Sequence, residues 1–238
     1  MTPHTKPGTK PGTKPGSIAP PTPPEVPAEP EMACAIAQSE DYVEITFTDL
    51  ELLDADVTYA RFVRCEFSRV QLTAAKLRGG SFVDVRFTDC DLSGADFHNA
   101  SLTRVEFRNC RMAGVNGSES ELRHVRFTGC KLDCANLRFA VLDHVRADEC
   151  SLVEADAYES TLNSVALRHC DLTEIDLTKT SITGLDLRGS RLEVLHGVAG
   201  IRGVTIGADQ VIPYALAVFA ETAVRVQPDE VDELDTGR

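Results

Sequence analysis

The sequence predicts an all-β solenoid, a chain wound into square coils of twenty residues and closed at its C-terminal end by a helix. Two observations support this prediction: a large apolar residue recurs at every fifth position, and residues of one type recur at every twentieth. Val85–Arg104 shows the first pattern, with four five-residue units centred on Phe87, Leu92, Phe97 and Leu102.

The five-residue period excludes the ordinary secondary structures as the source of the pattern. Along an α-helix, five residues advance a side chain by about 140° beyond a full turn, so successive central residues would face every direction. In a continuous strand, an odd step puts successive central residues on opposite faces. A single core therefore requires a chain that bends once per unit, which is the geometry of a solenoid.

The step of twenty indicates which units stack. Twenty residues are four units, so we infer one unit on each of four faces, with like residues stacked between coils. The first face has the central residues Phe47, Phe67, Phe87, Phe107 and Phe127; the second has mostly leucines, such as Leu92 and Leu132, with Cys90, Cys110, Cys130, Cys150 and Cys170 at its small inward position. The third face is centred on Val57 and its equivalents, and the fourth on Tyr42 and its equivalents.

The units CDLSG at Cys90, ADFHN at Ala95 and ANLRF at Ala135 have a small residue, then often Asp or Asn, then Leu or Phe. This pattern resembles that of the pentapeptide-repeat proteins, among which MfpA and the Qnr proteins are the best understood. The resemblance extends from Glu40 to about Ala199 and implies a right-handed, four-sided β-helix of about eight coils. All its central residues are apolar except Gly117 and Gly197.

Four segments follow from this reading. Residues 1–33 contain Thr-Lys-Pro-Gly three times and then a proline-rich run, and we expect them to be disordered or polyproline-like because they cannot bury apolar surface. Residues 34–199 are the β-helix, and 31–39 could form a short helix that covers its first coil. The tail, 227–238, is acidic and expected to be disordered.

Residues 200–226 are predicted to form a helix that caps the last coil. Asp209 is a plausible N-cap residue, and Pro213 is acceptable in a first turn. The resemblance implies a homodimer formed through this C-terminal end, with Leu216 and Phe219 as the candidate contact residues.

One stretch of the repeat is expected to be irregular. Gly117 and Ala157 leave the third face without a large central side chain, so either the core is underfilled or the coil tightens or bulges. We predict a local irregularity near 115–119, where Asn-Gly favours a turn with positive φ.

Composition limits the function classes. The net charge of −13 argues against direct nucleic-acid binding, which needs clustered Lys and Arg. No apolar run is long enough for a membrane span, and the N-terminus has no signal-peptide core. The stacked cysteines are interpreted as small buried hydrophobic residues, since parallel thiols do not converge on a metal ion, and a reduced cytoplasmic setting fits them.

No set of residues indicates catalysis, a metal site or a cofactor, and we predict that the protein is not an enzyme. His124 and His144 are twenty residues apart and should stack on one outer edge, but they lack a third metal ligand.

Surface charge differs between the faces. The second face has the most acidic residues, and its candidate partner-binding set is Glu51, Asp54, Asp91, Asp133, Glu154, Asp171 and Glu174. The corner between the fourth and first faces has a mildly basic edge, made of Arg64, Arg104, His124 and His144 beside Arg86, Arg126 and Arg146.

Two functions remain open. The resemblance implies an acidic DNA mimic that binds DNA gyrase or topoisomerase IV and protects the enzyme from fluoroquinolones or inhibits it. The alternative is a scaffold or adaptor that presents a flat face of the rod to another protein, without mimicking DNA.

Overall fold

The computed structural model describes residues 18–27, 31–32 and 35–225. Within these residues the strands are β1 (Glu31–Met32), β2 (Asp41–Val43), β3 (Ile45–Thr48), β4 (Arg61–Val63), β5 (Glu66–Ser68), β6 (Ser81–Thr88), β7 (Ser101–Arg108), β8 (Glu121–Arg123), β9 (Arg126–Thr128), β10 (Val141–Asp143), β11 (Arg146–Asp148), β12 (Thr161–Arg168), β13 (Ser181–Asp186) and β14 (Val204–Thr205). The helices are the 3₁₀ helices η1 (Val198–Gly200) and η2 (Ala208–Gln210) and the α-helix α1 (Val211–Glu221).

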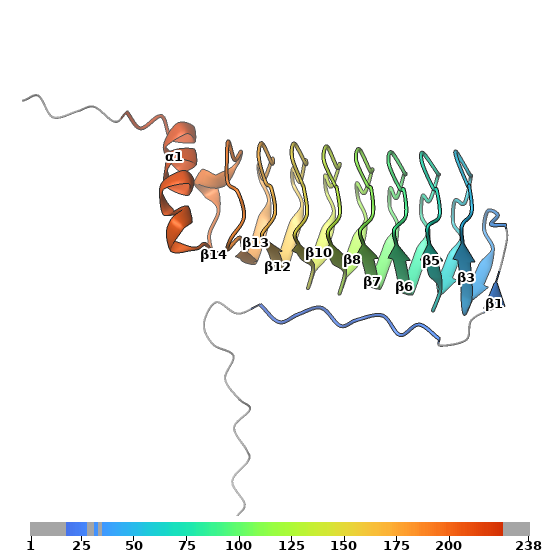
Figure 1. Ribbon diagram of the computed structural model, residues 1–238. Coiled ribbons are helices and arrows are strands. Elements are labelled where there is room, and N and C mark those ends of the chain that lie inside the picture. The colour runs from blue at the N-terminus through green and yellow to red at the C-terminus, as the bar shows by residue number, and fades with distance from the viewer. Residues whose placement is uncertain (1–17, 28–30, 33–34, 226–238) are drawn as a thin grey trace, which may run out of the picture.

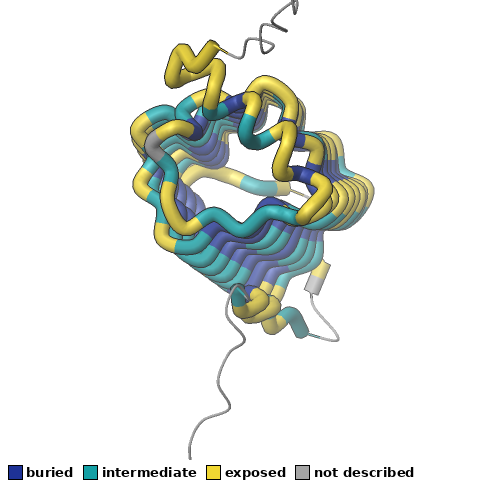
Figure 2. Tube along the Cα trace, turned by 90° about the vertical axis from the view of Figure 1, so that its left-hand side faces the viewer, coloured by how far each residue is buried: buried dark blue, intermediate teal, exposed yellow. Residues whose placement is uncertain are grey.

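The chain forms a right-handed, four-sided β-helix of about eight coils, as predicted, with α1 at its C-terminal end (Figure 1). The strands occupy the fourth and first faces and pair in parallel at the expected step, so that Phe82 lies beside Leu102 and Phe87 beside Phe107. The second and third faces have only single bridges between coils, such as that between Asp91 and Arg111. Seen along the axis, the buried residues line the inside of all four faces (Figure 2).

The chain turns each corner at a residue in the left-handed conformation. Positive φ recurs at every fifth residue from Ser39 to Val194, and most of these residues are not glycine. For a residue other than glycine, the left-handed conformation is about 1 kcal/mol less favourable than the right-handed one. The corner N–H groups are bonded to the next coil, as when the His124 N–H donates to the Asp143 carbonyl at 2.9 Å. The lattice between coils therefore holds the strained corners in place.

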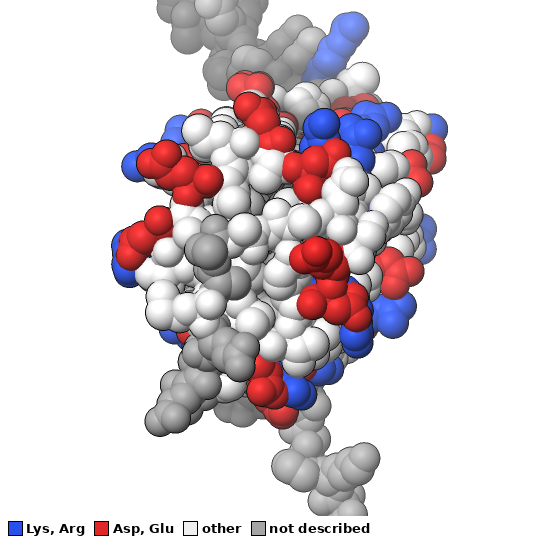
Figure 3. All heavy atoms as spheres, turned by 90° about the vertical axis from the view of Figure 1, so that its right-hand side faces the viewer, with Lys and Arg blue, Asp and Glu red and all other residues white. Residues whose placement is uncertain are grey.

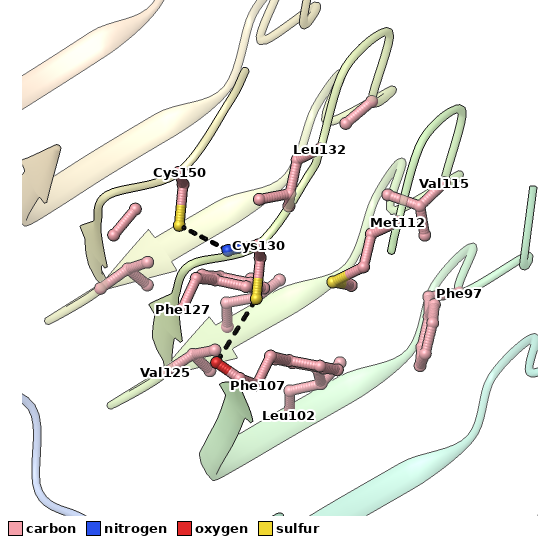
Figure 4. Close-up of a cluster of buried hydrophobic side chains, with 14 of the residues drawn as sticks. Phe97, Leu102, Phe107, Met112, Val115, Val125, Phe127, Cys130, Leu132 and Cys150 are labelled. Atoms are coloured by element: carbon pink, nitrogen blue, oxygen red, sulfur yellow. Dashed lines mark hydrogen bonds between the residues drawn. The ribbon is translucent and has the colours of Figure 1, made fainter. Parts of the chain in front are cut away.

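Side chains that are twenty residues apart in the sequence stack on one another inside the coil, as the repeat predicts. The rings of Phe47, Phe67, Phe87, Phe107 and Phe127 follow one another at centroid distances of 4.7, 4.5, 4.8 and 5.0 Å. Leu92 and Leu132 are also buried, and so are the stacked cysteines, here called the ladder cysteines: Cys90, Cys110, Cys130, Cys150 and Cys170. The Cys130 thiol donates to the Phe107 carbonyl at 3.5 Å, and the Cys130 N–H donates to the sulfur of Cys150 at 3.4 Å (Figure 4).

The predicted irregularity near 115–119 is wrong. Asn116 donates its N–H to the Ala95 carbonyl at 2.9 Å and Gly117 donates to the Asn136 carbonyl at 2.7 Å, so the coil is regular, and the positive φ falls on Glu119. The backbone lattice fixes the coil whatever the central side chain is. The missing side chain instead leaves the core underfilled, with an apolar cavity of about 30 Å³ beside Gly117.

Both ends of the solenoid differ from the predictions. The helix expected over 31–39 is not formed, because β1 pairs with β3 and extends the sheet. Residues 18–27 lie in extended conformation along the rod, as the polyproline-like alternative predicts, but Pro21 is buried, whereas the segment was expected to bury no apolar surface. Residues 1–17 and 227–238, predicted to be disordered, lie outside the described residues.

The C-terminal cap is built on Gln210 rather than on Asp209, which lies inside η2 and does not cap α1. The buried Gln210 side chain donates to the carbonyls of Leu187 and Ser190 at 2.8 and 2.5 Å, and its oxygen accepts the Gly207 N–H at 2.7 Å. Because a terminal coil has no following coil to satisfy its carbonyls, this amide takes over part of that role.

The cavity gives a stability prediction. In Gly117→Ala, the new methyl group would lie 3.1 Å from a Leu137 methyl carbon that borders the cavity and can move into it. We expect the free energy of unfolding to rise by about 0.5–1 kcal/mol, since alanine also reduces the entropy of the unfolded chain. Chemical denaturation measures the change.

The control is Gly94→Ala, where nothing lies within 4 Å of the new methyl but φ is +63°. This variant should lose about 1 kcal/mol to backbone strain. Equal effects of the two substitutions would show that the cavity is not what limits stability at Gly117.

Candidate protein-binding surface

The seven acidic residues predicted on the second face do lie on its outer side, in two groups. Glu51 and Asp54 are exposed in the first coil, and Glu154 and Glu174 are exposed one coil apart at the corner with the third face. Asp91, Asp133 and Asp171 are half-buried. The face therefore has an acidic group towards each end of the rod.

Basic residues separate the two acidic groups. On the outward column of the second face, Arg111 is bridged to Asp91 on one side and to Lys131 on the other. Arg111 lies 3.9 Å from the Asp91 carboxylate, and Arg191 lies 3.4 Å from that of Asp171. The acidic stripe is thus interrupted near the middle of the rod.

Five of the seven carboxylates make no ion pair within the described part of the chain: Glu51, Asp54, Asp133, Glu154 and Glu174. Asp133 accepts a hydrogen bond from the Val153 N–H at 3.2 Å. The Glu174 N–H donates to the Glu193 carbonyl at 2.9 Å, but no hydrogen bond to its carboxylate is found among the described residues. These carboxylates leave negative charge available to a partner.

The basic edge at the corner of the fourth and first faces is largely neutralised. Arg104 makes two hydrogen bonds of 2.6 Å with Asp84, and Arg86 lies 3.2 Å from Glu106. Arg64 pairs with Glu44. The sequence pattern indicates the arginines of this edge, but it does not show that carboxylates in neighbouring coils pair with them.

His124 and His144 stack as predicted, with ring centroids 4.9 Å apart. However, His124 is more than a solvated surface residue, because its Nδ1 accepts the N–H of Thr22 at 3.3 Å. No cluster of three potential metal ligands occurs in the described residues.

The ladder cysteines are shielded from solvent. All are free and buried. Hydrogen bonding to the thiols of Cys130 and Cys90, together with burial, raises the pKa of Cys110, and burial raises that of Cys65. Hydrogen bonds from neighbouring thiols lower the pKa of Cys90, Cys130 and Cys170. The two directions alternate along the column, so it is burial, which keeps reagents away from the sulfur atoms, that makes these cysteines structural.

The candidate dimer residues are both exposed on the C-terminal cap. Leu216 and Phe219 are 58% and 38% exposed, while Ala217 of the same helix is buried against the coil. Between α1 and the last coil lies a groove of about 600 Å³ whose lining includes Val194 and Ile212. A second copy of the chain could cover this apolar end.

Sequence reasoning missed an aromatic and cationic cluster on the third face. The Arg138 guanidinium lies 4.3 Å from the centre of the Tyr158 ring, and Lys179 lies 4.8 Å from it. Phe139 packs edge-on against Tyr158 and is 46% exposed. The twenty-residue step from Arg138 to Tyr158 and on to Thr178 would have placed part of this cluster.

Charge at the N-terminal end of the rod is mixed. Seen onto that end, acidic and basic side chains lie next to one another around the rim, while the centre is uncharged (Figure 3). Among the described residues, no helix is long and apolar enough to cross a membrane.

Comparison with known families settles what kind of repeat this is. The family model described as "Pentapeptide repeat region" matches residues 60–137 and 81–157, and that described as "Pentapeptide repeats (8 copies)" matches residues 158–193. The chain belongs to the pentapeptide-repeat family. No curated protein matches the sequence significantly.

Among solved structures, the pentapeptide-repeat chain resembles QnrB1, a plasmid-mediated fluoroquinolone resistance protein. Full-length QnrB1 is 19% identical with a TM-score of 0.54, over 82% of this chain and 100% of that one. A trypsin-treated QnrB1 variant is 22% identical with a TM-score of 0.53, over 82% and 99% of the two chains. At this identity the likeness shows a shared fold.

A buried carboxylate gives a pH prediction. Asp186 is fully buried and is hydrogen-bonded to Arg168 at 2.9 Å and to Arg188 at 2.7 Å. Burial alone would raise its pKa, but the bonds from Arg188 and Arg168 outweigh it and lower the pKa to about 2. The stabilisation is therefore complete above the ordinary pKa near 4 and is lost as the pH falls through about 2.

Asp186→Asn should lower the free energy of unfolding at pH 7 by about 3 kcal/mol, because it leaves two arginines without their partner. The difference from the wild type should shrink between pH 4 and pH 2. Denaturation curves at several pH values measure it, with Asp54→Asn on the exposed surface as the control. A difference that stays constant down to pH 2 would contradict the assignment.

Proposed function

We propose that this chain is a non-enzymatic binding protein whose acidic second face, with the corner next to it, takes the place of DNA on a type II topoisomerase such as DNA gyrase. The observation that supports this most directly is the set of carboxylates on that face without ion-pair partners among the described residues. The fold shared with a fluoroquinolone resistance protein is consistent with such a role.

The dimensions support the proposal in part. Eight coils at about 4.8 Å make a rod about 38 Å long, so seven carboxylates amount to about one per 5 Å. One DNA strand has one phosphate per 3.4 Å. The second face is therefore closer in charge density to a single strand than to a duplex, and a second copy would be needed to lengthen the acidic surface.

A gyrase supercoiling assay with purified protein tests the proposal. The protein should inhibit supercoiling or protect it from a fluoroquinolone, and the double variant Glu154→Gln, Glu174→Gln should need about tenfold more protein for the same effect, since contact charges of this kind contribute on the order of 1 kcal/mol. If the wild type has no effect in either format, the gyrase role is wrong.

The matched control is Glu119→Gln. Glu119 is also an exposed glutamate at a left-handed corner, but it lies between the third and fourth faces. It should leave the effect unchanged. If it reduces the effect as much as the double variant, overall negative charge matters and the second face does not.

The proposed assembly is a homodimer through the apolar C-terminal end. Leu216→Asp should give a monomer, because it places a charge in the middle of the apolar surface. Leu53→Asp is the control, since Leu53 is equally exposed at 55% but lies in the first coil. Light scattering after gel filtration gives the masses; a dimer that survives Leu216→Asp must use another surface.

A scaffold function is the second candidate, and two observations favour it. Arg111 and Lys131 interrupt the acidic stripe. The cluster of Phe139, Tyr158 and Arg138 on the third face has the residue types that dominate protein–protein hot spots. A gyrase assay without effect would leave this candidate as the better account.

A further inference from the structure

Residues 18–27, here called the proline strap, run along the outside of the rod (Figure 1). The strap contacts the corner of the fourth and first faces at His124 and Asp84. The residues in the left-handed conformation at this corner, here called the corner column, are Arg64, Asp84, Arg104, His124 and His144. The strap runs at right angles to the strands and in the direction of the first coil (Figures 1 and 2).

Two backbone hydrogen bonds attach the strap to the corner column. The Thr22 N–H donates to His124 Nδ1 at 3.3 Å, and the Glu25 N–H donates to an Asp84 carboxylate oxygen at 3.2 Å. Pro21 is buried, so the strap also covers apolar surface. Asp84 itself is only 6% exposed.

The spacing of the two bonds matches the geometry of a polyproline helix. Thr22 and Glu25 are three residues apart, which is one turn and about 9.3 Å of a polyproline II helix. His124 and Asp84 are two coils apart, which is about 9.6 Å at the usual distance between parallel strands. One turn of the strap therefore spans two coils of the rod.

The sequence of the strap fits this match. In Ala19-Pro-Pro-Thr22-Pro-Pro-Glu25, every third residue has an N–H group and the residues between are prolines, which have none. Since a polyproline helix has three residues per turn, these N–H groups all lie on one side of it. That side faces the corner column at Thr22 and Glu25.

The corner column holds its acceptors in fixed positions. Arg104 donates two hydrogen bonds to the Asp84 carboxylate and thereby fixes its orientation. The Glu25 N–H of the strap then donates to a carboxylate that is already in position. Burial works to raise the pKa of Asp84, but the bonds from Arg104 and from the Glu25 N–H keep it below its usual value. The ring of His124 is stacked on that of His144.

We propose that the corner column is a binding track for polyproline-type peptides that have a residue other than proline at every third position, and that the proline strap occupies it in cis. The strap blocks the corner opposite to the one that joins the second and third faces. A partner then has those two faces open to it, while a partner for the blocked corner has to displace the strap.

Amide hydrogen exchange of the full-length protein tests whether the strap is docked through its N–H groups. The Glu25 amide should exchange about tenfold more slowly than in the free peptide, the equivalent of one net hydrogen bond. Thr22→Pro keeps the polyproline conformation but removes a donor, and should abolish this protection. Thr22→Ala keeps the donor and should retain it.

Variants of the corner column test the acceptors. His124→Ala should release the strap, whereas His169→Ala should not, because His169 is an exposed histidine at the corner between the first and second faces. Circular dichroism shows whether both variants keep the β-helix. If Thr22→Pro and Thr22→Ala behave alike, or if His169→Ala releases the strap as His124→Ala does, the proposed contacts of the strap are wrong.

Binding in trans tests whether the column is a site in its own right. A fluorescent peptide of residues 18–27 should bind full-length Thr22→Pro, Glu25→Pro at least about tenfold more tightly than it binds the wild type, where the tethered strap competes at an effective concentration in the millimolar range. Addition of His124→Ala to this variant should remove the binding. Equal or absent binding to the wild type and the double-proline variant would overturn the proposal.

Discussion

The parallel hydrogen-bond lattice between coils is the interaction on which the rest of the structure depends. It pairs each residue with the one twenty positions away, and so it converts a repeat in the sequence into columns in space. It also holds a left-handed residue at every corner, most of them not glycine. Ring stacking, the cysteine ladder and the charge rows are all consequences of this one register.

The core could be predicted almost completely from the sequence, because its contacts depend only on the register. The Phe47-to-Phe127 stack and the buried cysteines required nothing beyond the twenty-residue step. The errors occurred where side chains were expected to govern the backbone. Gly117 was expected to distort its coil, but the lattice keeps the coil regular and a cavity takes up the missing volume. At the two ends, where no second coil continues the register, the expected helix at 31–39 and the Asp209 cap were wrong.

The surface was less predictable, because its charges act in pairs between coils. Counting by face located the acidic residues correctly but could not show that Asp84 neutralises Arg104 or that Arg111 interrupts the acidic column. The contact of the proline strap was missed for a different reason. Thr22 and His124 are separated by 102 positions, and nothing in a proline-rich sequence by itself specifies which surface it covers.

The lattice also explains why a proline-rich segment suits the corner. The backbone groups of the coils are already bonded to neighbouring coils, so a segment lying across them finds only side-chain acceptors, and those the strap uses, Asp84 and His124, are two coils apart. An ordinary extended chain would bring a donor for every residue, and those facing the coil would be left without partners at a cost of about 1–3 kcal/mol each. A polyproline helix brings one donor per turn on that side, and its turn spans two coils. The prolines therefore match the number of donors to the number of acceptors, a condition that a strand in this position would not meet.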